Sequence, residues 1–173
     1  MKLALIGTGK IVQEALTALQ EIPAAKIARQ AIFGRPHSRE KAEAMADEFG
    51  IAKVYTDYAE LLADPAIDFV YIGLVNSAHY SYTKQALMAG KNVILEKPST
   101  SSYIETKELA DLAVAKGLYL FEAVTLLHMP NFRGIQAALA ELGDIKLIQC
   151  NYSQYSSRYD AYKEGTVLPA LDP

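Results

Sequence analysis

Short apolar runs alternate with segments of helical periodicity from the start of the chain to residue 122. The apolar runs predict strands at residues 2–6, 26–33, 54–55, 69–74, 92–95 and 118–121. The intervening segments predict helices at residues 10–21, 38–49, 57–62, 77–89 and 103–116. Ser38 is expected to cap the second of these helices. Strands and helices that alternate over short links are typical of an α/β protein with a parallel, doubly wound sheet.

The pattern changes after residue 122. A helix is expected from Pro130 to near Leu142, and residues 145–155 then alternate polar and apolar, as in an antiparallel strand with one wet face. A single strand is not stable without partners, so either it pairs elsewhere or the rest of its sheet lies outside this chain. We therefore predict an α/β domain over residues 1–122. Residues 123–173 are predicted to be a crossover helix and the first strand of a truncated α+β second domain with an open antiparallel sheet.

Composition and charge exclude several classes of protein. The chain is 51% hydrophobic and 21% charged, and its net charge of −3 does not favour nucleic acid or an anionic membrane as a partner. No apolar stretch approaches the ~20 residues of a membrane span, and the N-terminal apolar run ends at Gly7, too early for a signal peptide. The single cysteine, Cys150, fits a reducing compartment, so we expect a cytoplasmic protein. The histidines, His37, His79 and His128, are too scattered to predict a metal site.

A glycine turn follows the first predicted strand in the stretch LALIGTGKIV. Gly7 allows a tight turn, and Gly9 leaves room for a pyrophosphate to approach the backbone at the start of the next helix. Val12 stands at the third position of the G-x-G-x-x-G fingerprint, where Gly or Ala allows closer packing of helix and strand. The alternative is a turn with a structural role only. We predict a Rossmann-type sheet whose turn binds a dinucleotide through Gly7, Thr8, Gly9, Lys10 and Ile11.

The end of the second predicted strand lacks the acidic residue that holds the ribose hydroxyls of NAD. The stretch FGRPHSREK offers Arg35 and Arg39 instead, and Glu40 is its first acid. A basic side chain here suits a 2′-phosphate, so NADP is favoured over NAD, with Arg35 as the binding residue. The alternative is that both arginines are solvated loop charges and that the site accepts both cofactors.

Ligands of open α/β sheets bind beyond the carboxyl ends of the strands, near the point where the strand order reverses. The end of the fourth predicted strand and the residues after it include Ser77 and three candidate cofactor contacts, Leu74, Asn76 and His79. The alternative roles are equally simple: Asn76 or Ser77 caps the next helix, and His79 lies on the surface of its first turn.

Glu96, Lys97 and Pro98 follow the fifth predicted strand, and Glu122 follows the sixth. An ammonium group beside a nicotinamide can hydrogen-bond a substrate oxygen and stabilise it during hydride transfer, which makes Lys97 the catalytic candidate. Glu96 is expected to position that amine or a ribose, and Glu122 to contact substrate. The alternative is a surface Glu–Lys pair worth at most about 1 kcal/mol.

Together these motifs resemble the Gfo/Idh/MocA family, the relatives of glucose–fructose oxidoreductase and inositol dehydrogenase. The matching stretches are GTGKIV, VYIGLVNSAHYSYTKQALMAGKNVILEKP and FEAVTLLHMPNF, and the resemblance covers essentially the whole chain. It implies that Lys97 contacts both substrate and cofactor, that Glu96 lies near the nicotinamide ribose, and that Asn76 and His79 lie along the cofactor. It also suggests a cis bond before Pro98.

The chain departs from the family pattern at three places. Val75 stands where Pro is common, and Leu127 where many members carry an Arg. The family's catalytic Asp and His are expected beyond Pro173. The resemblance further implies a second domain with a large open sheet, begun by the strand at residues 146–155, whose free face forms a homo-oligomer interface.

We therefore expect an NAD(P)-dependent oxidoreductase that moves a hydride between nicotinamide and a secondary alcohol or carbonyl of a sugar, polyol, cyclitol or dihydrodiol. The chain as given is expected to be inactive alone. Two alternatives remain open. One is a non-catalytic NAD(P)-binding redox sensor or regulatory module, and the other is an enzyme of the same fold that reduces amino-acid or bilin substrates.

Overall fold

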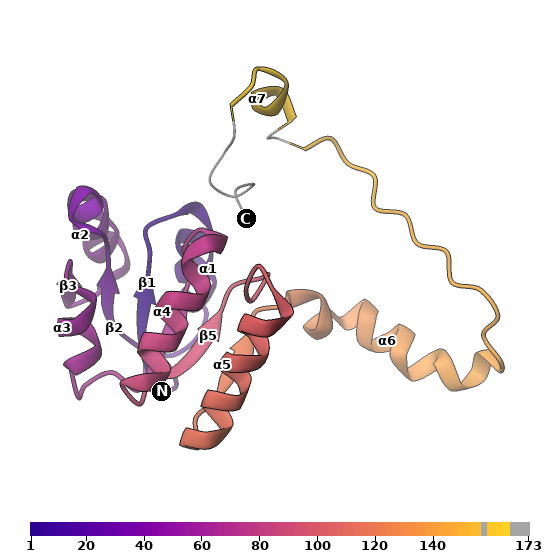
Figure 1. The fold of residues 1–173 in the computed structure, drawn as a ribbon, viewed down its shortest axis with the longest axis horizontal. Coiled ribbons are helices and arrows are strands. Elements are labelled where there is room, and N and C mark those ends of the chain that lie inside the picture. Colours follow the sequence, from indigo (N-terminus) through magenta and orange to yellow (C-terminus); the bar gives the residue numbers. More distant parts are fainter. Residues whose placement is uncertain (157–158, 167–173) are drawn as a thin grey trace. The chain divides into compact units, whose positions relative to one another are not determined.

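A computed structural model gives the fold of the chain and describes residues 1–156 and 159–166 (Figure 1). The chain divides into two compact units, the first spanning Met1–Ala123 and the second beginning at Val124. Among the described helices, none has the length and apolar character needed to cross a membrane.

The first unit is built on a parallel sheet of six strands. The strands are β1 (Lys2–Ile6), β2 (Ala28–Phe33), β3 (Lys53–Tyr55), β4 (Phe69–Ile72), β5 (Asn92–Leu95) and β6 (Leu120–Glu122). Their order across the sheet is β3-β2-β1-β4-β5-β6, so the direction of strand addition reverses between β1 and β4. This order confirms the predicted doubly wound sheet, and the predicted ligand crevice corresponds to the carboxyl ends of β1 and β4.

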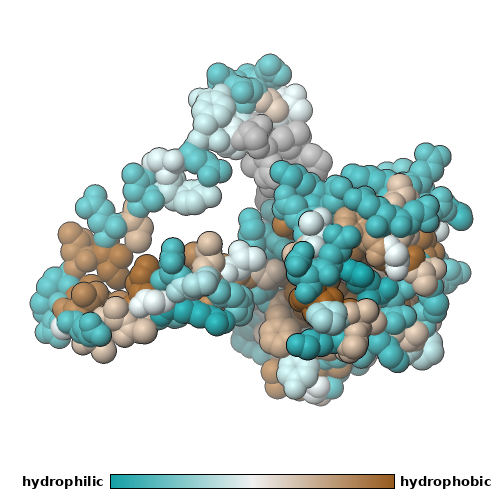
Figure 2. All heavy atoms as spheres, turned by 180° about the vertical axis from the view of Figure 1, so that it is seen from behind, coloured by the Kyte–Doolittle hydropathy of each residue, from teal (hydrophilic) through white to brown (hydrophobic). Residues whose placement is uncertain are grey.

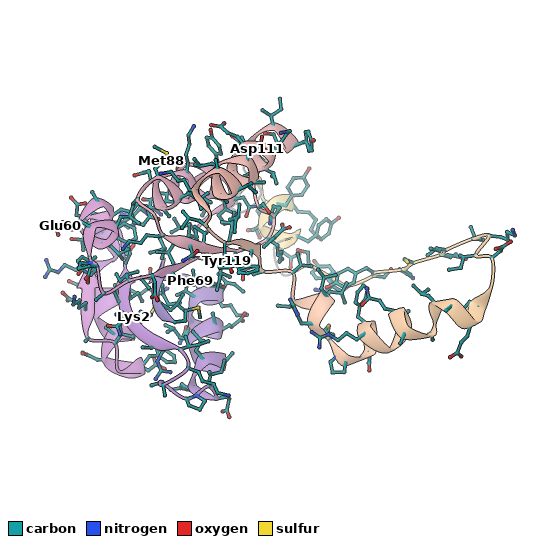
Figure 3. All side chains as sticks on the ribbon, turned by 90° about the horizontal axis from the view of Figure 1, so that it is seen from below. Lys2, Glu60, Phe69, Met88, Asp111 and Tyr119 are labelled. Carbon is teal, nitrogen blue, oxygen red and sulfur yellow. The ribbon has the colours of Figure 1, made fainter. Side chains whose placement is uncertain are left out.

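Helices cover both faces of this sheet (Figure 1). They are α1 (Lys10–Gln20), α2 (Arg39–Phe49), α3 (Tyr58–Ala63), α4 (Asn76–Met88) and α5 (Tyr103–Lys116). Because side chains alternate along a strand, Leu5 packs with buried residues of α1 and α2, whereas its neighbour Ile6 packs with those of α3, α4 and α5. Met88 of α4 and Asp111 of α5 accordingly lie on the same side of the sheet (Figure 3).

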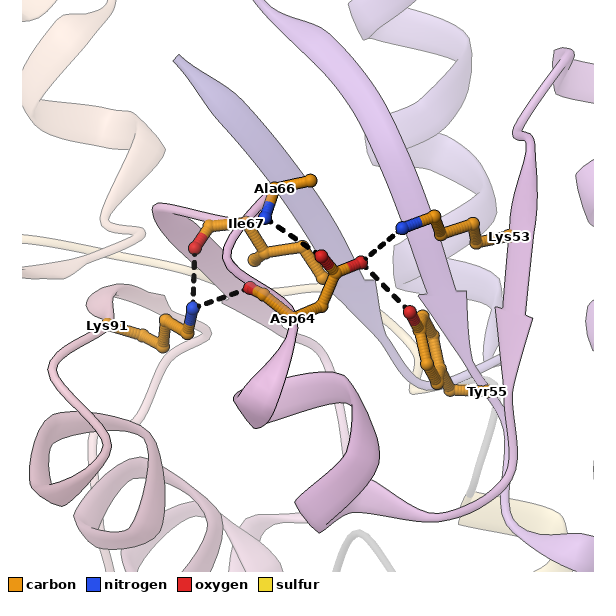
Figure 4. Close-up of polar contacts among 6 residues, drawn as sticks. All are labelled: Lys53, Tyr55, Asp64, Ala66, Ile67 and Lys91. Carbon is orange, nitrogen blue, oxygen red and sulfur yellow. Dashed lines mark hydrogen bonds and ion pairs between the residues drawn. The ribbon is translucent and has the colours of Figure 1, made fainter.

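A polar network joins β3 to the segments that precede β4 and β5 (Figure 4). The Asp64 carboxylate accepts hydrogen bonds from Lys53 Nζ (2.5 Å) and Tyr55 Oη (2.9 Å). The Lys91 ammonium donates to the carbonyl oxygens of Asp64 (2.8 Å) and Ile67 (2.7 Å). The hydrogen bond from Lys53 is the main reason that the pKa of Asp64 falls to about 2. This network lies at the end of the sheet away from the predicted site, so it anchors strands.

Two predicted boundaries differ from the structure. Ser38 makes no side-chain capping hydrogen bond to α2; it belongs to a 3₁₀ helix, Pro36–Ser38, that leads directly into α2. The sixth strand begins later than predicted and ends with Glu122, so this residue belongs to the strand itself. Both differences reflect local pairing and turn geometry that periodicity alone does not specify.

The second unit contains helices and no strand within the residues that the structure describes. The helix predicted from Pro130 forms as α6 (Pro130–Ala138) followed by a 3₁₀ helix, Leu139–Leu142; a further 3₁₀ helix, Thr125–His128, precedes it, and α7 spans Tyr159–Lys163. The strand predicted at residues 145–155 is not formed, because no neighbouring strand is present to share its hydrogen bonds. The predicted open antiparallel sheet remains a prediction. Apolar side chains are exposed along this unit, among them Ile135, Leu142, Leu147 and Ile148 (Figure 2).

Candidate functional site

Two glycines meet where the strand order reverses. Gly7, at the end of β1, has φ +119°, a conformation that side chains rarely adopt. A Cβ atom on Gly7 would lie 2.7 Å from the carbonyl oxygen of Gly73, which follows β4. The Gly73 N–H in turn donates to the Ile6 carbonyl oxygen at 3.0 Å. The two backbones therefore approach closely at this crevice, and Gly7 has the tight-turn role predicted from the sequence.

Gly73 also explains why Val12 is tolerated at the third fingerprint position. Val12 is fully buried on α1, and a Cβ atom on Gly73 would lie 2.7 Å from its Cγ2 atom. The close approach of helix and sheet is thus achieved by a glycine on β4 instead of a small residue on α1. Sequence reasoning missed Gly73, although a lone glycine at the end of the apolar run FVYIG was the available signal.

The start of α1 fits a phosphate group. Gly9 is the N-cap residue, makes no side-chain capping bond, and has no atom within 4 Å of the position that a Cβ would occupy. The first turn carries no acidic residue, so the helix dipole and the backbone N–H groups favour an anion here. Thr8 is half-buried, while Lys10 and Ile11 are exposed at this helix end. Direct cofactor contact by these residues remains a prediction.

Arg35 and Arg39 have different surroundings beyond β2. Arg39 Nε donates to Glu43 Oε1 at 2.7 Å, and this hydrogen bond raises the pKa of Arg39. The Arg35 side chain is exposed and forms no hydrogen bond or ion pair with another residue that the structure describes. Arg35 is therefore the guanidinium that remains free for a ligand phosphate.

His79 lies in the core and not on the surface. The ring is 1% exposed, with Nδ1 2.8 Å from the carbonyl oxygen of Pro98 and Nε2 3.2 Å from that of Leu74. The alternative of a surface histidine is therefore wrong. Because both ring nitrogens face main-chain carbonyls, His79 links the loop after β4 to the loop after β5, and a neutral ring can donate to only one of them. Its predicted contact with cofactor remains a prediction.

The start of α4 lacks the cap that the sequence offered as an alternative. The N-cap residue is Val75, without a side-chain capping bond, and the helix begins at Asn76. Neither Asn76 nor Ser77 is the N-cap, so that alternative is wrong. Asn76 and Leu74 are half-buried beside the crevice, where both were predicted to contact the cofactor.

The Glu96 carboxylate is held by a residue that sequence reasoning missed. Tyr71 Oη donates to Glu96 Oε1 at 2.7 Å, and the Lys97 N–H donates to Glu96 Oε2 at 3.2 Å. Burial raises the pKa of the Tyr71 phenol above its ordinary value, and the hydrogen bond to Glu96 raises it further. Tyr71 therefore keeps its proton and acts as the donor. The available signal was a single phenol within the otherwise apolar run FVYI.

Lys97 stands exposed within a loop that is fixed around it. The Lys97–Pro98 peptide bond is cis, as expected. Next in the chain, the Ser99 N–H donates to Glu122 Oε1 at 2.9 Å. Tyr71, His79 and Glu122 thus hold the loop through Glu96, Pro98 and Ser99 respectively. The Lys97 ammonium itself has no hydrogen bond or ion pair among the residues of known placement.

The structure thus brings most of the predicted residues to one edge of the sheet. The ends of β4, β5 and β6 carry Asn76, Glu96, Lys97 and Glu122, while the glycine turn and Arg35 follow β1 and β2. Within the described ranges, no group of three or more His, Cys, Asp or Glu residues is placed to hold a metal ion.

Strand order and the glycine turn define a class of protein, those built on a Rossmann-type, nucleotide-binding fold. More particularly, the chain belongs to the Gfo/Idh/MocA oxidoreductase family with an NAD-binding Rossmann fold, whose model matches residues 1–124. This match confirms the family that the sequence motifs suggested.

Similar proteins of this family include dehydrogenases and a ketoreductase. Scyllo-inositol 2-dehydrogenase (NADP(+)) of Bacillus subtilis is 34% identical over 173 residues, which are 100% of this chain and 52% of that protein. Trans-1,2-dihydrobenzene-1,2-diol dehydrogenase of Xenopus tropicalis is 32% identical over 153 residues, 87% of this chain and 46% of that protein. The structure of the Actinomadura kijaniata 3-ketoreductase KijD10 with NADP matches with a TM-score of 0.74 at 32% identity, over 82% of this chain and 44% of that one. The chain spans about half the length of these relatives.

Proposed function

We propose that this chain is the cofactor-binding part of an NAD(P)-dependent oxidoreductase acting on a secondary alcohol or its carbonyl. The observation that carries the proposal is the loop after β5. Its flanking groups are each hydrogen-bonded to another strand or helix, whereas the Lys97 ammonium between them is exposed and unpaired in the described structure. A fixed loop with a free ammonium suits a group that must meet a ligand oxygen.

The residues present fit a nicotinamide cofactor. The open Gly9 backbone and the uncapped start of α1 would hold the pyrophosphate, Arg35 a 2′-phosphate, and Glu96 and Asn76 the nicotinamide half. When bound, the nicotinamide supplies or accepts the hydride. Lys97 donates a hydrogen bond to the substrate oxygen and stabilises negative charge there, and we propose that Glu122 also contacts the substrate. The proton-relay residues are proposed to lie in the second domain.

NADP is the favoured cofactor, with NAD as the alternative. The absence of an acid between the end of β2 and Glu40 and the free guanidinium of Arg35 support this preference. The B. subtilis relative carries NADP(+) in its name, and the KijD10 structure contains NADP.

The substrate is proposed to be a sugar, polyol, cyclitol or dihydrodiol, because the similar proteins are named for an inositol, a dihydrodiol and a ketoreductase activity. We further propose one cofactor domain over residues 1–122 and the beginning of a substrate domain over residues 123–173. A homo-oligomer formed through the sheet of that second domain, and a cytoplasmic location, belong to the same proposal.

Replacement of Lys97 by alanine tests the function. In the complete protein, Lys97→Ala is expected to lower kcat/KM by at least about 100-fold on an active polyol, because the substrate oxygen loses its donor. The affinity for NADP should fall by no more than about tenfold, because at most one hydrogen bond to the cofactor is lost. Turnover is followed by nicotinamide absorbance, and cofactor affinity by fluorescence titration.

The matched control is Lys41→Ala, which removes an exposed lysine from α2 and should alter neither quantity. Full turnover by Lys97→Ala would contradict the proposed role. A wild-type protein that binds NADP tightly but turns over none of a broad panel of polyols, sugars and dihydrodiols would favour the redox-sensor alternative.

A further inference from the structure

The side chains of Tyr71 and Glu96 meet because of strand register. Tyr71 on β4 pairs with Ile94 on β5, and Glu96 follows Ile94 by two positions. Side chains two positions apart point to the same face of a sheet, so Tyr71 and Glu96 both lie on the face covered by α1. The phenol spans the diagonal between the two strands and reaches Glu96 Oε1 at 2.7 Å.

This contact leaves Glu96 with unused hydrogen-bonding capacity. A carboxylate has about four lone-pair positions, of which the Tyr71 hydroxyl and the Lys97 N–H occupy two. The Glu96 side chain is not fully enclosed, because the residue retains 9% exposure. It can therefore accept further hydrogen bonds from a ligand while its orientation is set by Tyr71.

Tyr71 is itself 7% exposed, and it packs beneath Gly73 at the crevice. A Cβ atom on Gly73 would lie 3.2 Å from Tyr71 Cε1, so the glycine leaves the room that the ring occupies. The ring is held by packing and the hydroxyl by Glu96. Such a side chain has no freedom to bind a ligand directly but is well suited to fix the direction of a carboxylate.

We propose that Tyr71 is a positioning residue that orients Glu96 for hydrogen bonding to the nicotinamide half of the cofactor. This inference rests on the proposed function, in which Glu96 lies near the nicotinamide ribose. It adds a residue of β4 that touches neither cofactor nor substrate but acts on cofactor affinity through the carboxylate.

A double-mutant cycle on NADPH affinity tests the proposal. The proteins are wild type, Tyr71→Phe, Glu96→Gln and the double variant, each in the complete protein and each titrated by NADPH fluorescence. Glu96→Gln should weaken NADPH binding about tenfold, and Tyr71→Phe about fivefold. The double variant should bind within about twofold of Glu96→Gln alone, because Tyr71 acts only through that carboxylate.

Tyr55→Phe is the matched control. Tyr55 Oη donates to the Asp64 carboxylate at 2.9 Å, so this variant loses a similar hydrogen bond to a carboxylate at the opposite end of the sheet. Tyr55→Phe should leave the NADPH affinity unchanged. This should hold even if the melting temperature of Tyr55→Phe falls as much as that of Tyr71→Phe.

Three results would overturn the inference. Tyr71→Phe could lower the melting temperature and leave NADPH affinity intact, which would make its role structural only. The effects of Tyr71→Phe and Glu96→Gln could multiply, which would show that the two residues act independently. A protein that binds neither NADP nor NAD would overturn both this inference and the proposed function.

The Lys97→Ala measurement separates the two proposals. Loss of turnover in Lys97→Ala with multiplying effects in the cycle would refute the role of Tyr71 alone. Full turnover in Lys97→Ala together with the expected cycle would refute the catalytic proposal and leave the positioning role of Tyr71 in cofactor binding supported.

Discussion

At the scale of single residues, two arginines four positions apart have separate roles. Arg39 forms an ion pair with Glu43 on α2. Arg35 precedes the 3₁₀ helix, and its guanidinium has no partner among the described side chains. A guanidinium that already donates to a carboxylate has fewer donors for a second anion. We therefore propose that Arg35, and not Arg39, influences the choice of cofactor.

Neutralising each arginine in turn checks this assignment. Arg35→Gln should weaken NADP binding by at least about tenfold, since a charge-assisted contact to the 2′-phosphate is lost. NAD binding should change by less than about threefold, and Arg39→Gln should leave the ratio of the two affinities unaltered. Calorimetric titration of wild type and both variants with each cofactor gives the six dissociation constants. Equal losses for NADP and NAD in Arg35→Gln would refute the assignment.

The sequence predicted the residues of the site better than it predicted their neighbours. Lys97 and Glu96 could be found because they come directly after an apolar run, and a buried strand places the residues at its carboxyl end on the sheet edge. The contacts of Tyr71 with Glu96 and of His79 with Pro98 could not be assigned, since these partners lie 25 and 19 positions away and are brought close only by the pairing of β4 with β5. Through-space pairing of this kind leaves no periodic signal in one sequence.

At the scale of elements, the packing of α1 against the sheet depends on a large side chain at Val12 and the lack of one at Gly73. The helix carries the larger residue and the strand end the smaller one, which reverses the arrangement of the fingerprint. The position of the glycine turn depends on this contact, because Gly9 is the N-cap residue of the same helix.

Gly73→Ala is expected to destabilise the protein by about 1–3 kcal/mol, because the new methyl group would overlap Val12. Adding Val12→Ala should recover part of this loss, so that the two changes are less than additive by roughly 1 kcal/mol. Urea unfolding measures both effects. Gly9→Ala is the control. A Cβ atom at this position meets open space, so the free energy of unfolding should not change, whereas the affinity for NADP should fall. Additive losses at Gly73 and Val12 would contradict the packing argument.

Most elements could be predicted because periodicity reports which faces are buried. Residues 145–155 show what periodicity leaves open: polar and apolar residues alternate there, but a strand also needs a neighbour, and no neighbouring strand is present in the described structure. Alternation predicts a two-faced segment, while pairing decides whether that segment becomes a strand.

At the scale of the whole molecule, the buried core is confined to one unit. Every buried apolar residue in the described chain lies between Leu3 and Ala113, and the second unit exposes most of its large apolar side chains. The described residues of the second unit therefore contribute little to the core but much apolar surface, which favours association.

A fragment of residues 1–123 should consequently fold without the rest of the chain. Its urea midpoint should be close to that of the 173-residue chain, and its dissociation constant for NADP should agree within about twofold. Light scattering should show less self-association for the fragment. Leu147→Ser/Ile148→Ser in the longer chain, which removes two exposed apolar residues, should reduce association in the same direction. Loss of the helical circular dichroism signal in the fragment would show instead that the second unit is needed for folding.

The Asp64 network has a consequence for how such a protein can change. It holds β3 and the amino ends of β4 and β5 with side chains that lie at the opposite edge from the lysine loop and the glycine turn. Loops at the carboxyl edge can therefore exchange residues, and with them cofactor preference or substrate choice, without loosening the scaffold. A designer seeking new specificity would leave Lys53, Asp64 and Lys91 untouched and vary only the other edge.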